Sequence, residues 1–480
     1  MPSKSKTKCP GPVPAMPKRL ALAASMAALC TGLCAPAFSA DTEVLLDKLR
    51  EKGVLTEEEY QEMRTEARAE RRAQALKEAN EADKAAKKAE SAASELTGRF
   101  KDGFSWESGD KENAIALNGR IHADYRQFDQ NSTNANAANT FDVRRAYIGI
   151  AGRVANDWTF EVVADVAQTT APQLDVAWVN WGSYKQVQFR AGQFKMPMAL
   201  EELTSSRFID FTERSFVDQY APAKERGAML HGTPFTGVFY GLAASNGNGK
   251  NANETSSTVD GKDIIGRLGV NVAEIIGNKD TVLHFAAAYS DGRESAALLV
   301  PSARTEGRGI TFFTPAVFTS DYNRKRTAEE ISLAWNQFKL QGEMLTANFK
   351  TETGAPVDFD IDTYYAEVMW LITGEKYADA YRNGAYGAIK PNRPFKKGAE
   401  GWGAWEFGVR FSKFDAGDFP TIAGQSTKAD ATTVGFKWIP NTNTRVYLNY
   451  IMTEFDTPVN VVGGTTDKEN AINMRFAFYF

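Results

Sequence analysis

The chain has 480 residues, of which 43% are hydrophobic, 24% charged and 11% aromatic, and its mean hydropathy is −0.39. Residues 1–40 hold five basic and no acidic groups, so the 56 basic and 60 acidic groups of the whole chain leave a net charge near −9 beyond them. This acidic balance argues against a general nucleic-acid binder. No later stretch has the roughly 18 apolar residues of a transmembrane helix, which excludes a polytopic helical membrane protein.

Residues 1–40 have the pattern of a secretory signal peptide. A basic leader ends at Arg19, an apolar run covers Leu20–Leu29, and small residues follow, so we expect cleavage between Ala37 and Asp41. All three cysteines lie in this segment. The exported chain would therefore have no thiol nucleophile, zinc–cysteine site or iron–sulfur cluster, and we expect no cofactor.

Residues 41–98 are rich in Ala, Glu, Lys and Arg and have a helical period. Gly53 interrupts the pattern, and Thr56 with Glu59 forms a capping box for the next helix. Small residues then recur at alternating spacings of four and three, which is typical of a coiled-coil seam: Ala75, Ala79, Ala82, Ala86, Ala89, Ala93 and Leu96. The segment is predicted to be either an oligomerising stalk or a solvated single helix that acts as a spacer.

After Gly98 the hydrophobic period changes to two, as in strands with one wet and one apolar face. An antiparallel sandwich would give the same alternation. However, the strands run to about ten residues and their connections alternate long and short, which favours an outer-membrane type of barrel. The long polar stretch 129–140, for example, precedes the short turn 154–157.

We therefore predict an all-β domain over residues 99–480, a 16-stranded antiparallel transmembrane β-barrel, preceded by an α-helical coiled-coil segment on the periplasmic side. A barrel of about this size leaves a water-filled lumen. The strands are expected near residues 115–126, 141–151, 158–167, 174–182, 187–194, 226–232, 238–245, 263–272, 281–290, 329–336, 338–348, 363–373, 404–413, 432–439, 444–454 and 470–480. The segment Gly374–Gly403 is an unusually long connection for the short-turn end.

The last predicted strand carries aromatic residues at every second position up to Phe480. This pattern resembles the terminal signature of barrels that are handed to the outer-membrane assembly machinery, which we expect as a partner. An even number of strands places both ends of the barrel on the same side of the membrane. The helical segment is therefore expected in the periplasm.

Several short motifs stand in order along the barrel segment: Phe141–Ile150, Asn156–Trp158, Gly192–Pro197, Leu200–Arg207, Thr373–Glu375 and Gly401–Glu406. Together they resemble the phosphate-selective porin O and P family, from about Phe104 to Phe480. The resemblance implies a sixteen-stranded trimeric channel in a Gram-negative outer membrane. It also implies that the loop after the fifth strand folds inward as a constriction.

The resemblance further suggests site residues. Arg144, Arg145 and Tyr147 match the paired-arginine motif of the phosphate-binding members. Arg214 resembles a second constriction arginine, and Arg207 ends the matching Leu200–Arg207 motif and is counted with the anion-binding residues. Strict alternation, however, points the Arg144 side chain at lipid, and only a bulge or a position near the rim would bring it into the lumen.

Glu202 stands where the family pattern has a basic residue. At an effective dielectric constant near 20, two like charges 4 Å apart cost on the order of 4 kcal/mol before screening, so a carboxylate there would repel a dianion. We therefore expect Arg145, Tyr147 and Arg214 to converge on the solute path, opposed by Glu202. Phosphate specificity is accordingly less secure than channel function.

The polar faces of the predicted strands place charges of both signs in the lumen. The basic residues are Arg120, Arg126, Arg145, Arg190, Arg410, Lys437, Arg445 and Arg475, and the acidic residues are Asp124, Glu161, Asp165, Asp175, Glu367 and Glu406. This balance predicts a modest anion preference. The alternative is that these charges only keep the wall wet and pair with each other.

Two further clusters of charged residues could bind ions. Asp358, Asp360 and Asp362 have the spacing of a calcium loop but lack its glycine and final carboxylate, so surface-loop acidity is the better interpretation. The basic run 324–326, expected near the end of a long external loop, would recruit anions or bind the phosphates of lipopolysaccharide.

The predicted function is therefore passive diffusion of small anions, with phosphate or polyphosphate as candidate solutes. The alternatives are a general, low-selectivity porin whose stalk tethers the outer membrane, and an outer-membrane hydrolase. No Gly-x-Ser-x-Gly motif and no compact Ser/His/Asp group supports the hydrolase, so no enzymatic activity is expected. The expected partners are small anions, outer-membrane lipids and lipopolysaccharide, the assembly machinery and two further copies of the chain.

Overall fold

The computed structural model describes residues 39–100, 103–129, 138–167, 171–253, 261–296, 300–315, 318–351, 356–398 and 400–480. The chain divides into two compact units, the first ending at Ser91 and the second beginning at Ala92. The expected signal peptide lies outside the described residues except for its last two positions. Within the described ranges, none of the helices has the length and apolar character needed to cross a membrane.

The first unit is a helical hairpin of α2 (Ser39–Glu51) and α3 (Glu57–Ser94). The predicted capping box is present, because the Thr56 amide donates to Glu59 Oε2 at 2.9 Å and the Glu59 amide donates to Thr56 Oγ1 at 3.3 Å. Tyr60 is buried in the hairpin, and its hydroxyl donates to Asp47 Oδ1 at 2.5 Å. The seam alanines from Ala75 to Ala86 are exposed in the single chain.

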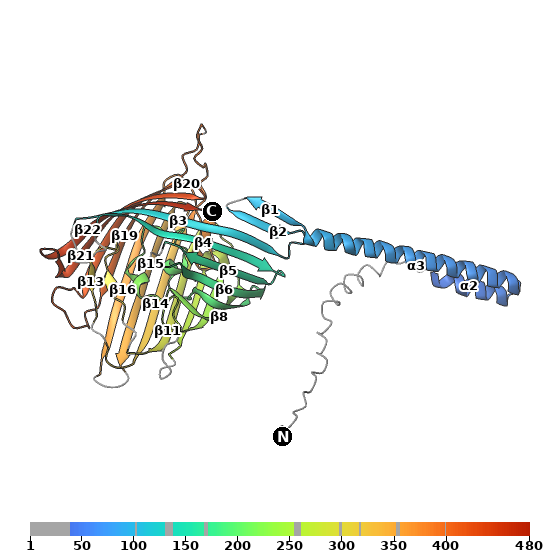
Figure 1. The fold of residues 1–480 in the computed structure, drawn as a ribbon, viewed down its shortest axis with the longest axis horizontal. Coiled ribbons are helices and arrows are strands. Elements are labelled where there is room, and N and C mark those ends of the chain that lie inside the picture. Colours follow the sequence, from blue (N-terminus) through green and yellow to red (C-terminus); the bar gives the residue numbers. More distant parts are fainter. Residues whose placement is uncertain are drawn as a thin grey trace, which may run out of the picture. The chain divides into compact units, whose positions relative to one another are not determined.

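The second unit is the predicted closed barrel of sixteen antiparallel strands (Figure 1). The last barrel strand pairs with the first, with Arg475 opposite Asp124, and this pairing closes the sheet. Each predicted strand overlaps one observed strand: β3 (Ala114–Phe128), β4 (Thr140–Val154), β5 (Trp158–Asp165), β6 (Gln173–Tyr184), β7 (Val187–Lys195), β8 (Lys224–Phe235), β9 (Val238–Ser245), β10 (Asp263–Asn271), β11 (Thr281–Glu294), β14 (Tyr322–Trp335), β15 (Phe338–Thr351), β16 (Asp358–Leu371), β19 (Ala404–Asp415), β20 (Lys428–Asn441), β21 (Thr444–Val461) and β22 (Gly464–Tyr479).

A short hairpin that the sequence did not predict precedes the barrel. Its strands β1 (Leu96–Phe100) and β2 (Phe104–Ser108) pair with each other, and β2 also pairs with β3. The helix therefore ends at Ser94, and the expected boundary at residue 98 falls inside β1. Strands of five residues are too short to establish a period of two.

The two faces of the barrel wall follow the alternation of the sequence. Most outward-facing side chains are apolar, and tryptophans such as Trp335, Trp370 and Trp405 are exposed near the short-turn end, as in the aromatic girdle of membrane barrels. Inward-facing positions carry the charged residues. Every charged residue that was assigned to the lumen from its strand parity lies on the inner face.

Three connections fold into the lumen, and together they give the barrel a packed interior. The first, residues 196–223, holds α4 (Leu200–Leu203) and α5 (Phe216–Tyr220), as expected for an inward loop. The second, whose described part includes residues 300–315, contributes β12 (Ala303–Arg304) and β13 (Thr311–Phe313). The rings of Phe216 and Phe312, one from each connection, lie 5.8 Å apart between centroids.

The third inward segment, residues 377–391, belongs to the long connection at the short-turn end. It holds η3 (Tyr377–Ala380) and the small hairpin of β17 (Tyr381–Arg382) and β18 (Ala385–Tyr386). The Tyr386 amide donates to Thr204 Oγ1 at 3.3 Å, so inward segments from opposite ends of the barrel meet. This segment, which looked anomalous as a turn, forms part of the interior.

The two charged clusters that were expected on external loops lie on strands instead. β14 begins seven residues before the predicted start, so Arg324 and Arg326 point inward, where both contact Asp263, and only Lys325 points outward. Asp358 to Asp362 lie on β16, where Asp358 pairs with Lys350 of the neighbouring strand at 2.7 Å. The part of the chain that the structure describes contains no group of side chains suited to a metal ion.

Candidate functional site: a basic cavity in the lumen

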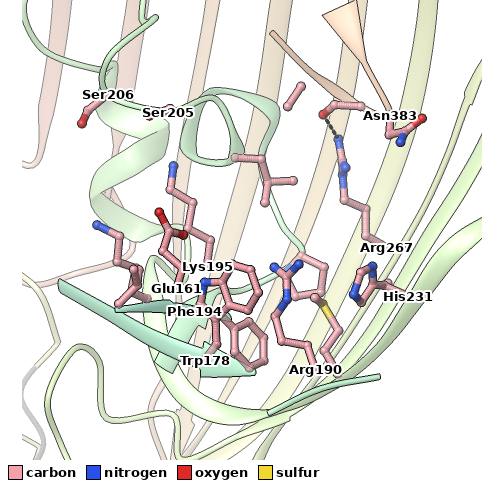
Figure 2. A pocket seen from close by; sticks show the side chains of 18 of the residues that line it. Glu161, Trp178, Arg190, Phe194, Lys195, Ser205, Ser206, His231, Arg267 and Asn383 are labelled. Atoms are coloured by element: carbon pink, nitrogen blue, oxygen red, sulfur yellow. Dashed lines mark hydrogen bonds between the residues drawn. The ribbon is translucent and has the colours of Figure 1, made fainter. Parts of the chain in front are cut away.

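A cavity of about 710 Å³ lies between the inner face of strands β3–β10 and two inward segments, residues 197–214 and 383–385 (Figure 2). Its charged lining is strongly unbalanced. Two acidic residues, Glu161 and Asp175, face it together with eight basic residues: Arg120, Arg145, Arg190, Lys195, Arg207, Arg214, Lys224 and Arg267. The site therefore presents a net positive wall to any solute.

Four of these guanidinium groups have no carboxylate within ion-pairing distance in the described residues: those of Arg120, Arg145, Arg190 and Arg207. Arg120 donates to Ser206 Oγ at 2.5 Å and Arg207 donates to Asn118 Oδ1 at 3.0 Å, which ties the inward loop to β3. Each of the four also keeps one buried nitrogen that has no hydrogen-bond partner in the structure. Unpaired buried donors of this kind are costly unless a ligand or water meets them.

Aromatic rings hold two of these guanidiniums in place. Arg120 lies over the Tyr147 ring at 4.4 Å from its centroid. Arg190 lies over the Trp178 ring at 4.2 Å, and both of these residues are labelled in Figure 2. Such stacking fixes the direction of a guanidinium and leaves its in-plane N–H donors available. Tyr147, which the family motif groups with Arg144 and Arg145, therefore positions the guanidinium of Arg120.

Arg144 reaches the lumen through a β-bulge. In the pairing of β3 with β4, His122 lies opposite Arg145 and Ala123 lies opposite Val143, so Arg144 is the extra residue. Its Nε donates to Glu213 Oε1 at 2.8 Å and its Nη2 donates to Oε2 at 3.2 Å. Neighbouring arginines therefore both point inward, Arg145 onto the cavity and Arg144 onto the constriction loop.

Glu202 does not oppose the arginines across the cavity, as the sequence had led us to expect. Its buried carboxylate pairs with Arg214 Nη1 at 2.7 Å and with Lys195 Nζ at 3.6 Å, and it is absent from the cavity wall. Burial raises the pKa of Glu202, but Arg214 and Lys195 outweigh that effect and hold the pKa at about 2. The carboxylate neutralises cations that line the cavity and does not itself meet the solute.

Arg410 lies away from the cavity, on the filled side of the lumen. It is buried and pairs with Glu201 at 3.0 Å and with Glu306 at 2.6 Å, both from inward loops. Arg475 likewise pairs with Asp124 and Glu213. Pairing of wall charges, the alternative that the sequence leaves open, therefore holds for Arg410 and Arg475. In the described residues, Arg120, Arg145 and Arg190 have no carboxylate partner.

Sequence reasoning missed three basic residues of the cavity. Lys195 and Lys224 end β7 and begin β8, on either side of the long inward loop, and Lys224 pairs with Asp175 at 2.7 Å. Arg267 pairs with Glu330, and its Nη2 donates to the Gly384 carbonyl at 3.2 Å. The alternating pattern of its strand predicts an inward-facing Arg267 side chain, so this residue could have been found from the sequence. Its contact with the Gly384 carbonyl could not, because Gly384 lies in an irregular segment.

The closed barrel, its inward loops and its basic lumen define an outer-membrane porin, a protein that forms a channel. Residues 115–480 match the family described as phosphate-selective porin O and P, and the chain belongs to this family. The resemblance found in the motifs is thereby confirmed.

Individual proteins and solved structures are also similar to this chain. The chain is 24% identical over 413 residues to Porin O of Pseudomonas aeruginosa, a match that covers 79% of this chain and 91% of that protein. Among solved structures, it is similar to the outer membrane channel DcaP of Acinetobacter baumannii, with a TM-score of 0.50, 9% identity and coverage of 77% of this chain and 97% of that one. OmpT of Vibrio cholerae gives a TM-score of 0.49 at 10% identity over 77% of this chain and 98% of its own.

Proposed function

We propose that the channel passes small anions in preference to cations and that phosphate-like oxyanions bind transiently in its basic cavity. The observation that carries this proposal is the group of four guanidiniums without counter-carboxylates on one wall of the lumen. Arginine donors match the oxygens of phosphate or carboxylate, and rigid positioning lowers the entropy lost on binding. The name of the family supports phosphate as one candidate solute.

Reversal potentials in asymmetric KCl test this proposal directly. Folded wild-type protein in a planar bilayer should give a chloride-to-potassium permeability ratio above one, and inorganic phosphate should reduce the chloride current in a concentration-dependent way. A ratio below one, or a current that phosphate leaves unchanged, would refute the anion site. Absence of any stepwise conductance would refute the solute path through the lumen.

A second proposal concerns assembly. The chain works as a trimer with its helical segment in the periplasm, and the exposed alanine seam of α3 is the expected contact between stalks. Alanine buries little surface, so the stalk adds to an association of barrels and does not replace it. Conductance steps in groups of three, together with the mass of the detergent complex, test the trimer. Steps of single units would contradict it.

The outer surface suggests further partners of the barrel. The apolar outward face contacts membrane lipid, and outward-facing basic residues near the long-loop end, such as Lys325, are the proposed contacts for lipopolysaccharide phosphates. The aromatic positions of β22 up to Phe480 are the proposed signal for the assembly machinery. Lower levels of folded barrel in cells after Phe478→Ser and Phe480→Ser would support this assignment, and unchanged levels would oppose it.

A further inference from the structure

The wall of the basic cavity also carries an apolar strip. Tyr147, Val163 and Val176 form a buried cluster on the inner face of β4, β5 and β6, and Trp178 packs against it. Inward-facing positions in water-filled barrels are normally polar, because they contact the aqueous lumen. Trp178 is only partly buried, so part of its surface faces the cavity.

The strip lies between the unpaired charges. The strand order places β4, β5 and β6 between β3, which carries Arg120, and β7, which carries Arg190. Arg207, held against β3 through Asn118, joins the first of these groups. A solute that spans the strip therefore meets guanidinium donors at both of its edges.

Inorganic phosphate uses only part of such a site. A small hydrated oxyanion gains nothing from valine or tryptophan surface, whereas a flat apolar ring gains free energy in proportion to the area that it covers. The volume of about 710 Å³ is also in the range of sites for whole organic ligands. Both features favour a solute that is larger and less polar than phosphate.

We infer that the cavity selects organic anions with a planar apolar body, such as aryl phosphates and aryl carboxylates, over inorganic phosphate. This inference rests on the proposed anion channel and names its preferred solutes. The acidic group is held by Arg190 or by Arg120 and Arg207. The ring of the solute lies against the open part of Trp178, beside the buried Val163 and Val176, where offset or edge contacts with the indole are available.

Two probes of equal charge isolate the contribution of the ring. Phenyl phosphate and methyl phosphate are both dianions at pH 8, and each is titrated against the chloride current of the folded channel in a planar bilayer. The area covered by one face of a phenyl ring corresponds to about tenfold in affinity, so phenyl phosphate should block at about one tenth of the methyl phosphate concentration. Equal blocking concentrations in an anion-selective channel overturn the inference and leave the proposed function intact. A channel without anion preference overturns the proposed function itself.

Two variants locate the preference on the strip. Trp178→Ala should reduce the tenfold ratio between the probes to about threefold or less, and Val176→Thr, which changes polarity but hardly changes shape, should reduce it in the same direction. If Trp178→Ala does not fold, Val176→Thr alone tests the inference. Because the readout is a ratio of two blocking concentrations in one variant, changes in pore width that affect both probes cancel.

Two controls complete the experiment. Trp405→Ala removes an outward-facing tryptophan and should leave the ratio unchanged. Arg207→Gln should weaken both probes to a similar degree and preserve the ratio, because Arg207 belongs to the Arg120 group at the other edge of the strip. A ratio that persists in both Trp178→Ala and Val176→Thr would overturn the inference.

Discussion

Arg144 and Glu213 join the barrel wall to the constriction loop through two parallel hydrogen bonds of 2.8 and 3.2 Å. The same carboxylate accepts from Arg475 at 2.9 Å and lies 3.9 Å from Arg308. Burial raises the pKa of Glu213, but Arg144, Arg308 and Arg475 outweigh that effect and hold it well below its ordinary value. One loop carboxylate thus serves as the shared counter-charge for three segments of the chain.

Glu213→Gln should loosen the constriction loop, because Arg144 and Arg308 lose the carboxylate that they share and Arg475 keeps only its pair with Asp124. Removing one partner of a buried ion pair typically costs about 3–5 kcal/mol. We expect a lower urea midpoint in unfolding followed by tryptophan fluorescence, together with larger and noisier single-channel currents. Glu112→Gln, an exposed carboxylate on a short turn, is the matched control and should behave as wild type. A Glu213→Gln channel with wild-type conductance and midpoint would show that the ion pairs do not hold the loop.

Glu202→Gln should increase the preference for anions, because Arg214 and Lys195 both line the cavity and would lose the carboxylate that they share, which leaves Arg214 with Asp218 at 3.5 Å. Glu202→Lys, in contrast, adds a third cation to a buried cluster, so it should impair folding before it changes selectivity. Reversal potentials measure the anion preference of Glu202→Gln, and the heat-modifiable band on gels measures the folding of Glu202→Lys. An unchanged or lower anion preference in folded Glu202→Gln would contradict this account.

Arg145→Ala and Arg190→Gln should each reduce anion preference and weaken phosphate block, since each removes an unpaired guanidinium from the cavity wall. For a partly hydrated wall we expect about tenfold or less in apparent affinity. Lys325→Gln removes an outward-facing charge and is the control, with no expected change in the phosphate-block curve. If all three variants gave the same curve, the two arginines would lie away from the solute path.

The stability of the constriction loop should depend on pH in one direction. A carboxyl whose pKa is lower in the folded than in the unfolded protein stabilises the fold above its unfolded pKa, and that stability is lost as pH falls through the folded pKa. With the pKa of Glu202 at about 2, its contribution should decline as pH falls below about 4. Urea midpoints at pH 7, 5 and 3 measure this. The urea midpoint of Glu202→Gln should fall less than that of wild type between pH 5 and 3. An equal fall would show that other titrating groups cause the loss of stability.

Removal of residues 41–94 should leave a conducting barrel, because the helix ends at Ser94 and the β1–β2 hairpin remains paired beside β3. Single-channel conductance should match wild type. A longer deletion through Ser108 also removes the strand pairing with β3 and should lower the urea midpoint. Failure of the shorter deletion to insert would make the stalk a requirement for assembly.

The strands of the barrel were predictable because each presents one face to lipid and one to the lumen, so a period of two runs through every one of them. The inward hairpin around Tyr381 and Tyr386 was not predictable. It is irregular, and its tyrosines are buried only through partners such as His284 and Ser332 on distant strands. For Arg144 the sequence left open a bulge or a position near the rim, and the structure shows the bulge.

The site was predictable in part for the same reason. Parity placed Arg120, Arg145 and Arg190 on the inner face, where they lie. Parity does not reveal which charges remain unpaired, because that depends on carboxylates supplied by loops. Arg410, for example, is neutralised by Glu201 and Glu306, which are 209 and 104 residues away in sequence. Glu202 was misplaced because its partner Arg214 lies on the same folded loop.

The pairing of Arg475 links closure of the barrel to the anchoring of the constriction loop during folding. Arg475 lies 351 residues from Asp124, its partner across the closing pair of strands, and it also contacts the carboxylate of Glu213 on the constriction loop. Strands separated by almost the whole domain form their contacts late, because the entropy of closing so long a loop opposes them. Full anchoring of the constriction loop requires Arg475, so it follows closure of the seam. We therefore expect a folding stage in which the wall of the barrel is largely formed and the constriction loop is not yet fully anchored.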